Sequence, residues 1–138
     1  MIAYLDSSVI LRVILGQRNR LPEWTSIGQG VASALVEVEC LRSLDRLRLV
    51  QPMSDQKLAL RREAVFRLLG EIRVVELDRP VLARASQSFP TPLGTLDAIH
   101  LATALLVRET GQAEIVMATH DAALATAARA SGFHVLGD

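Results

Sequence analysis

The chain has 138 residues, of which 50% are hydrophobic and only 4% are aromatic. This length suits one domain with one well-developed hydrophobic core, and that core must consist mainly of Leu, Val, Ile and Ala. Fifteen basic residues balance fifteen acidic ones. The summed charge therefore favours neither a strongly basic nucleic-acid surface nor a membrane-binding one, so any phosphate-binding patch must be local.

Cysteine usage and the N-terminal sequence bear on the compartment. Cys40 is the only cysteine, which excludes an internal disulfide and a multi-cysteine metal site and is consistent with a reducing cytoplasm. The chain shows no basic stretch followed by an apolar segment and a cleavage site, and no apolar run reaches the roughly 18 residues that span a membrane. We expect a soluble, cytoplasmic protein without a membrane partner.

Apolar runs and capping residues predict the secondary structure. The predicted strands are residues 2–5, 31–32, 72–77, 115–118 and 133–136. The predicted helices are residues 9–15, 33–50, 54–69, 79–88, 95–109 and 121–130, with loops at 18–30 and 90–94. Ser7 or Ser8 is expected to cap the first helix and Thr95 the fifth, while Gly16 and Gly70 mark helix ends.

The order of these elements predicts the fold class. Strands that are apolar on both faces alternate with helices, which is typical of a parallel sheet covered on both sides. The helices at 33–50 and 54–69 are expected to form a hairpin. Residues 1–138 are therefore predicted to form one three-layer α/β/α domain with a central, mainly parallel sheet.

Three aspartates are predicted to lie near one edge of this sheet. Asp6 directly follows the first strand, and Asp121 follows the strand at 115–118. In an open parallel sheet the ligand crevice lies outside the carboxyl ends of the strands. Asp97 lies in the first turn of the helix "TLDAIHLATALL" and could face the same crevice. Each aspartate also has a purely structural interpretation. Asp6 and Asp121 can cap the helices that follow them, and Asp97 can interact favourably with the dipole of its helix.

A fourth carboxylate comes from the segment "LVEVECLRSL". Glu37 and Glu39 lie two positions apart, which puts them on nearly opposite faces of a helix, so only one can point at a common site. The alternative for Glu39 is a surface ion pair with Arg42 at i+3. The spacing does not choose between Glu37 and Glu39.

Convergent carboxylates imply a cation. A pair of them about 4 Å apart repels by roughly 4 kcal/mol at an effective dielectric of 20, so a cluster must take up protons or a metal ion. The sequence offers no regularly spaced His and Cys ligands, and all-oxygen ligands select Mg²⁺ or Mn²⁺. Such an ion activates water and neutralises phosphate oxygens in phosphodiester hydrolysis.

Four segments resemble one family. "YLDSSVILR", "SALVEVECLRSL", "TLDAIHLATAL" and "MATHDAALATAARASGFHVL" are similar to segments of PIN-domain ribonucleases, most closely the VapC-type toxins of toxin–antitoxin pairs. The resemblance covers nearly the whole chain, in the order and spacing of that family. It implies a PIN domain that cleaves RNA with Mg²⁺ or Mn²⁺, is restrained by a cognate antitoxin, and forms a homodimer.

The resemblance also assigns site residues. It implies that the four acids are Asp6, Glu39, Asp97 and Asp121, with Asp6 and Asp97 as direct metal ligands and the other two completing the site directly or through water. Ser7 and Thr119 match the small hydroxyl residues that accompany these acids. By analogy alone, Glu39 is preferred to Glu37.

Histidines and basic residues are weighed separately. His100, His120 and His134 are not assigned to catalysis, and a polar residue half-buried in its helix is the preferred interpretation of His100. Residues 40–69 carry seven basic residues against three acidic ones. Arg42 and Arg46 are candidate RNA contacts on this hairpin, which could instead present a solvated face or bind an antitoxin peptide.

Two other functions remain open from the sequence. An aspartyl phosphatase of the haloacid dehalogenase type also places Asp after its first strand, but it needs a second Asp two positions later, where this chain has Ser8. A non-catalytic RNA- or protein-binding module of the same fold would be favoured by loss of an acid, and none of the four is missing.

Overall fold

The computed structural model of the chain describes residues 1–111 and 114–138. Its strands are β1 (Ile2–Leu5), β2 (Gln29–Ser33), β3 (Arg73–Val75), β4 (Ile115–Ala118) and β5 (Val135–Leu136). Its helices are α1 (Ser7–Ile14), the 3-10 helix η1 (Pro22–Ser26), α2 (Leu35–Val50), α3 (Asp55–Glu71), α4 (Arg79–Ala85), α5 (Thr95–Thr110) and α6 (Ala122–Ala130).

The five strands form one parallel sheet in the order β3-β2-β1-β4-β5. The chain builds outward from β1 through β2 to β3, and then crosses back to add β4 and β5 on the other side of β1. The strand order therefore reverses between β1 and β4. In open α/β sheets this point is where the loops separate and leave a crevice at the carboxyl ends of the strands.

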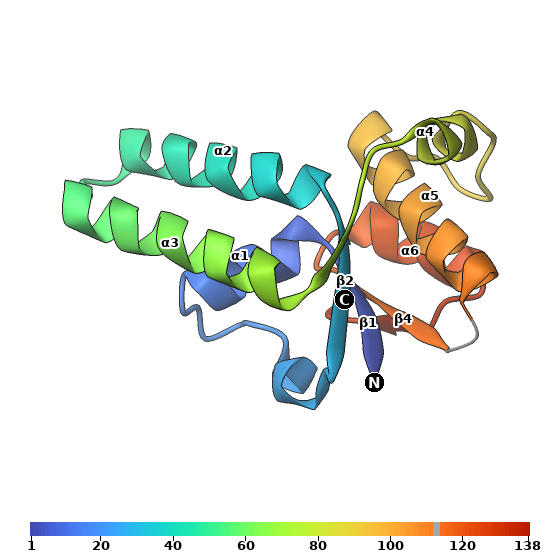
Figure 1. The fold of residues 1–138 in the computed structure, drawn as a ribbon, viewed down its shortest axis with the longest axis horizontal. Helices are drawn as coiled ribbons and strands as arrows, with labels where there is room; N and C mark the ends of the chain where they lie inside the picture. Colours follow the sequence, from blue (N-terminus) through green and yellow to red (C-terminus); the bar gives the residue numbers. More distant parts are fainter. Residues whose placement is uncertain (112–113) are drawn as a thin grey trace.

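Helices cover both faces of the sheet, which confirms the predicted three layers (Figure 1). Alternate residues of β1 face opposite sides, because Cβ atoms alternate along a strand. Ala3 and Leu5 pack with residues of α1, α2 and α3. Tyr4 packs with residues of α5 and α6. Helices α2 and α3 form the predicted hairpin, which projects from the body of the molecule (Figure 1).

Several predicted boundaries are wrong for local physical reasons. Asp6, rather than Ser7 or Ser8, caps α1, because its extended backbone lets its carboxylate accept the Ser7 N–H at 2.8 Å. Thr95 is the first helical residue of α5, after Gly94 at the cap position. Helix α3 continues through Gly70 to Glu71. Glycine favours a helix end where the backbone turns left-handed, as at Gly16 after α1, with φ 63°, and at Gly132 after α6, with φ 87°.

Strand β2 is longer than predicted, and an unpredicted 3-10 helix, η1, lies in the predicted 18–30 loop. Gln29 and Gly30 are not typical strand residues, yet they pair with Ile2 and Ala3 of β1. Sheet pairing thus overrides local propensity there. Conversely, β3 and β5 are shorter than their apolar runs, because pairing with β2 and β4 covers only part of each run.

Gly30 is required by close packing, and this gives a stability prediction. A Cβ at this position would lie 2.8 Å from Ile72 Cγ2 and 2.8 Å from Leu5 Cδ1. We expect Gly30→Ala to lower the free energy of unfolding by about 1–3 kcal/mol, because both side chains must move. Urea unfolding measures this effect. Gly70→Ala is the matched control, since nothing lies within 4 Å of its Cβ position and alanine favours a helix by roughly 0.5–1 kcal/mol. An unchanged or raised stability of Gly30→Ala would contradict the packing argument.

Two further observations concern the burial of Cys40 and the hydropathy of the helices. Cys40 is 0% exposed, and burial, together with the charges of Glu39 and Asp6, raises the pKa of its thiol to about 12. Cys40 is therefore a buried, unreactive residue. Within the described residues, no helix has the length and apolar character needed to cross a membrane.

Candidate functional site

The candidate site lies at the carboxyl ends of β1 and β4, where the strand order reverses. Asp6 directly follows β1, and the backbone N–H of Asp6 donates to Ala118 O of β4 at 3.0 Å. Thr119, His120 and Asp121 directly follow β4. The two loops are thus neighbours because their strands pair in parallel, Leu5 opposite Ala118. This confirms the sheet edge predicted for Asp6 and Asp121.

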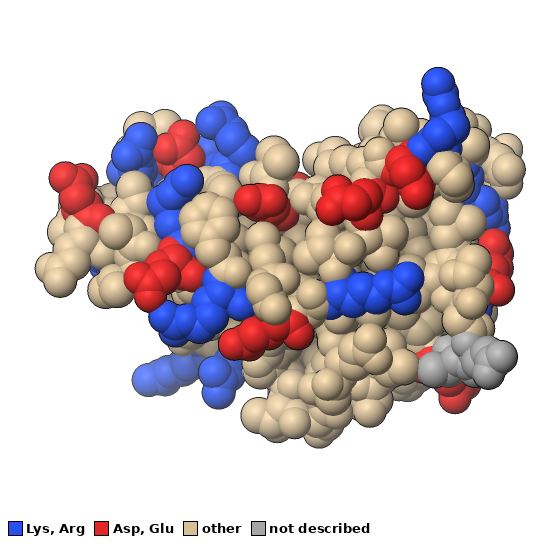
Figure 2. Space-filling view, in the orientation of Figure 1, with Lys and Arg blue, Asp and Glu red and all other residues tan. Residues whose placement is uncertain are grey.

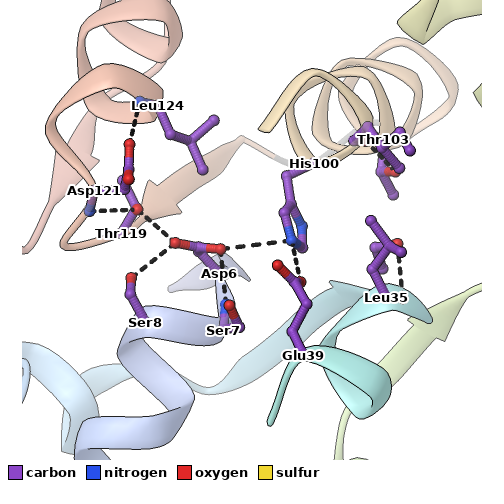
Figure 3. A network of polar contacts seen from close by, with 12 residues as sticks. Asp6, Ser7, Ser8, Leu35, Glu39, His100, Thr103, Thr119, Asp121 and Leu124 are labelled. Carbon is purple, nitrogen blue, oxygen red and sulfur yellow. Dashed lines mark hydrogen bonds and ion pairs between the residues drawn. The ribbon is translucent and has the colours of Figure 1, made fainter. Parts of the chain in front are cut away.

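Asp6 is the most enclosed carboxylate of the site, at 4% exposure. Its Oδ1 accepts the backbone N–H of Ser7 at 2.8 Å, and its Oδ2 accepts the hydroxyls of Ser8 at 2.7 Å and Thr119 at 2.8 Å (Figure 3). Two hydroxyl donors use both lone pairs of Oδ2, whereas one donor leaves a lone pair on Oδ1. His100 Nε2 lies 3.6 Å from this Oδ1.

The two hydroxyls also link the loops after β1 and β4. Ser8 Oγ accepts the backbone N–H of His120 at 2.9 Å, and Thr119 Oγ1 accepts the backbone N–H of Asp121 at 3.0 Å. Each hydroxyl therefore donates to Asp6 and accepts from the β4 loop. This arrangement holds the Asp6 carboxylate in one orientation before any ligand arrives.

The structure corrects one sequence prediction about these hydroxyls. Thr119, as predicted, steadies Asp6 through its side chain. Ser7 supplies its backbone N–H to Asp6, and the hydroxyl on the carboxylate comes instead from Ser8. The physical reason is helical geometry, because Ser7 and Ser8 differ by about 100° around α1.

Glu39, rather than Glu37, points toward Asp6. Glu39 lies on α2 with its side chain 20% exposed, and its Oε1 is 2.6 Å from His100 Nε2 (Figure 3). Glu37 is exposed. The alternative ion pair between Glu39 and Arg42 does not form, because Arg42 pairs with Asp45 at 3.3 Å.

His100 was missed as a site residue by the sequence interpretation. It is 0% exposed, where a half-buried residue was expected, and its two ring nitrogens contact Tyr4 and Glu39. Its position three residues after Asp97 was a usable signal, because i and i+3 share a helix face. A histidine that shares a helix face with a carboxylate is stronger evidence for a site residue than a histidine without such a neighbour.

Asp97, on α5, and Asp121, in the loop after β4, lie outside the set of ligand atoms within 4.8 Å of one another, but the charges of the other acids act on Asp97. Burial, and then the charges of Asp121 and Asp6, raise the pKa of Asp97 to about 6, while the charge of His100 lowers it. The pKa of Asp97 therefore depends on the charges of the other acids. Asp121 is exposed, and its Oδ1 caps α6 by accepting Leu124 N–H at 2.9 Å. The predicted capping roles of Asp6 and Asp121 are both real, but each cap uses only one carboxylate oxygen.

The acids are not neutralised by nearby basic residues. Across residues 1–111 and 114–138, no Lys or Arg nitrogen lies within 4.0 Å of an oxygen of the four carboxylates, and His100 is their sole ion-pair partner. One oxygen each of Asp6 and Glu39, with His100, forms a set whose ligand atoms lie within 4.8 Å of one another. Carboxylate oxygens without Lys or Arg partners attract a hard divalent cation.

A cavity of about 690 Å³ lies elsewhere, between α4, the loop after it and α5. Thr95, Ala98 and Ile99 line it on α5. At 100° per residue, Asp97 and His100 lie on the opposite face of that helix. The acidic group thus sits at an open sheet edge rather than in this cavity, and an open edge suits an extended substrate.

Comparison with known proteins agrees with the fold. Residues 3–130 match the PIN domain family. The chain is 34% identical over 108 residues to "Ribonuclease VapC46" of Mycobacterium tuberculosis, which covers 73% of this chain and 72% of that protein.

Three solved structures share the fold at low sequence identity. FitAB bound to an IR36 DNA fragment matches at TM-score 0.69 and 18% identity, covering 98% of this chain and 93% of that one. The Mycobacterium tuberculosis sarcin-ricin loop cleaving toxin VapC20 matches at 0.62 and 18%, covering 96% of each chain. A toxin-antitoxin complex from Klebsiella pneumoniae matches at 0.59 and 16%, covering 88% and 87%. With the family match spanning most of its length, this chain belongs to the PIN-domain family.

Proposed function

We propose that this protein is a metal-dependent endoribonuclease and the toxin of a toxin–antitoxin pair. The observation that carries the proposal is the group of acids at the switch point of the sheet, which share no Lys or Arg partner among the described residues. The relationship to a protein named as a ribonuclease supports RNA as the substrate class. The proposed unit is a single PIN domain, residues 1–138, that acts in the cytoplasm.

The donor set fits Mg²⁺ or Mn²⁺. Asp6, Glu39, Asp97 and Asp121 would hold the ion, with Asp6 and Asp97 as the direct ligands and the other two acting directly or through water. Asp6 Oδ1 retains a lone pair, and the only described donor to Glu39 is His100, on Oε1. When bound, such an ion lowers the pKa of water and neutralises charge on the phosphate oxygens.

The chain itself supplies orientation and proton acceptors. Ser8 and Thr119 fix the Asp6 carboxylate, so little conformational freedom is lost when a ligand binds. Glu39 and Asp121 would orient an attacking water or accept its proton. The raised pKa of Asp97 means that this site releases a proton when it takes up a cation near pH 6.

The proposed partners are RNA, a cognate antitoxin protein and a second copy of the chain. The similarity to a structure described as a toxin-antitoxin complex supports the antitoxin. The α2–α3 hairpin carries much of the Lys and Arg surface on the face shown in Figure 2, and it could contact either RNA or an antitoxin peptide.

Arg42 and Arg46 are the proposed RNA contacts on this hairpin. They follow Glu39 at i+3 and i+7, so they extend from the acid along one face of α2. Among the described residues Arg42 pairs with Asp45 alone, at 3.3 Å, and Arg46 donates to Ser43 Oγ at 3.1 Å. Exposed pairs of this kind contribute little and can be exchanged for phosphate.

We expect Arg42→Ala and Arg46→Ala to weaken RNA binding and to make it less dependent on salt. Each lost phosphate contact should reduce the slope of log K against log salt by about 0.7 for single-stranded RNA. Fluorescence anisotropy with labelled RNA in chelator measures this slope. Arg12→Ala, on α1, is the control and should leave the slope unchanged. Equal salt dependence of RNA binding in all variants would show that Arg42 and Arg46 do not contact RNA phosphates.

The experiment that tests the function is cleavage of RNA by the purified chain, freed of any partner. Total cellular RNA, tRNA and rRNA are incubated with Mn²⁺ or with chelator, and 5′ ends are mapped. Internal cuts that need the metal support the proposal. A folded chain that binds RNA but cuts none of these substrates would instead favour the alternative, a non-catalytic binding module of PIN fold.

A further inference from the structure

Two fully buried polar rings, those of Tyr4 and His100, lie beside the acidic group. Tyr4, on β1, and His100, on α5, are each 0% exposed. The Tyr4 hydroxyl lies 2.7 Å from His100 Nδ1, and the rings meet edge to face with centroids 5.9 Å apart. The other ring nitrogen, Nε2, lies 2.6 Å from Glu39 Oε1. These contacts form a chain from β1 through α5 to α2.

The direction of the hydrogen bonds follows from proton affinities. Burial and the charge of Asp6 raise the pKa of Tyr4 well above its ordinary value, so the phenol keeps its proton. With neutral His100, Tyr4 donates to Nδ1 and the imidazole proton lies on Nε2. With the charged imidazolium, both nitrogens carry protons. In either state Nε2–H donates to the carboxylate of Glu39.

Both ring nitrogens of His100 already have partners. The Tyr4 hydroxyl lies 2.7 Å from Nδ1, and Glu39 Oε1 accepts from Nε2 at 2.6 Å. A donor nitrogen has no lone pair to offer a cation. The geometric set of Asp6, Glu39 and His100 is therefore better understood as two carboxylates and one hydrogen-bond donor than as three metal ligands.

We propose that His100 is a positioning residue, held by Tyr4, which fixes Glu39 Oε1 and leaves Glu39 Oε2 available to the cation, directly or through water. This inference rests on the proposed metal-dependent function and assigns a residue to it. Partners that orient a ligand carboxylate typically contribute about 10–100-fold to metal affinity or activity. Tyr4 is two steps removed from the cation, so its contribution should be smaller than that of His100.

Three substitutions separate positioning from ligation and from simple loss of fold. Tyr4→Phe keeps the ring and removes only the hydroxyl. His100→Leu removes both nitrogens, and His100→Gln retains an N–H donor. Ser131→Ala is the matched control, because it removes a hydrogen bond to Ala127 O at 2.8 Å, at the far end of α6. Circular dichroism and thermal unfolding establish that each variant is folded.

The readouts are Mn²⁺ affinity, from the EPR signal of free Mn²⁺, and the coordination of bound Mn²⁺, from pulsed EPR. We expect wild-type protein to bind Mn²⁺ without a directly coordinated nitrogen. His100→Leu should weaken binding by about 10–100-fold, Tyr4→Phe by several-fold, and His100→Gln by less than His100→Leu. Ser131→Ala should bind like the wild type. If His100→Leu does not fold, Tyr4→Phe and His100→Gln still carry the test.

Each contrary result has a distinct meaning. A ¹⁴N coupling in the wild type that disappears in His100→Leu would make His100 a metal ligand and overturn the positioning role. If the folded Tyr4→Phe and His100 variants bind Mn²⁺ as tightly as the wild type, the contacts between Tyr4, His100 and Glu39 serve only the fold, and the positioning role is wrong. A wild type that binds no Mn²⁺ would overturn the proposed metal-dependent function itself, and the positioning role with it.

Discussion

Replacing Asp6 by asparagine is expected to reduce RNA cleavage by at least about 100-fold while leaving the fold intact. The substitution removes the charge of the most buried carboxylate of the site, and a neutral amide is a poor ligand for a hard cation. Losses of this size are typical when a group that stabilises transition-state charge is removed. Initial rates on a defined RNA with Mn²⁺, at equal protein concentrations, measure the effect.

The fold should survive because asparagine can replace the structural role of Asp6. Its side-chain oxygen can still accept the Ser7 N–H and cap α1, since Asn and Asp are equivalent caps. The hydroxyls of Ser8 and Thr119 can rotate and accept from the new amide. Thermal unfolding in chelator should therefore change little.

The matched control is Glu37→Gln, which removes an exposed acid from the same helix as Glu39. Its cleavage rate should equal that of the wild type. Undiminished cleavage by a folded Asp6→Asn variant would show that Asp6 only caps α1, and the acidic group would lose its claim to be the active site.

Replacing Asp97 by asparagine is expected to have opposite effects on the metal-free and metal-bound protein. The pKa of Asp97 is about 6 in the folded chain, above its ordinary value of 3.8, because burial and the charges of Asp121 and Asp6 disfavour the carboxylate. The folded state therefore binds this proton more tightly than the unfolded state. Its stabilising contribution is complete below about pH 4 and is lost as the pH rises through 6.

At pH 8 the wild type without metal carries the full cost of the charged Asp97. Because the side chain is only partly buried, water screens much of this cost, and we expect about 1 kcal/mol. Asp97→Asn should thus raise the Tm in chelator at pH 8 by about 4 °C, with little change at pH 4. Differential scanning calorimetry at both pH values measures the difference.

Addition of Mn²⁺ should reverse this ranking. A ligand at 100 times its Kd stabilises a protein by about 2.7 kcal/mol, which corresponds to roughly 8–10 °C for a chain of this size. The wild type should show that shift and Asp97→Asn should lose most of it. Equal shifts, or a lower stability of Asp97→Asn in chelator at pH 8, would mean that Asp97 is not part of a cation site. Glu37→Gln is again the control.

Local sequence patterns predicted those elements whose boundaries coincide with a change in polarity. The strands at 2–5 and 115–118 were predicted with the bounds that β1 and β4 have. In both, a short apolar run is followed immediately by polar residues, so the end of the strand coincides with the change in polarity. Strand β2 begins at Gln29 and Gly30, before its apolar run starts. Only the pairing of these two residues with β1 identifies them as part of the strand.

The sequence alone determined the parallel α/β class and the sheet edge on which Asp6 and Asp121 lie, because each acid directly follows a strand and parallel strands share a carboxyl edge. The choice of Glu39 over Glu37 by geometry and the burial of His100 were decided only by tertiary structure. The contact between Glu39 and His100 joins residues that are 61 positions apart in the sequence. It depends on how α2 and α5 are placed relative to each other at that edge. Hydrophobic periodicity indicates which face of a helix is buried, but it does not specify which neighbour covers that face.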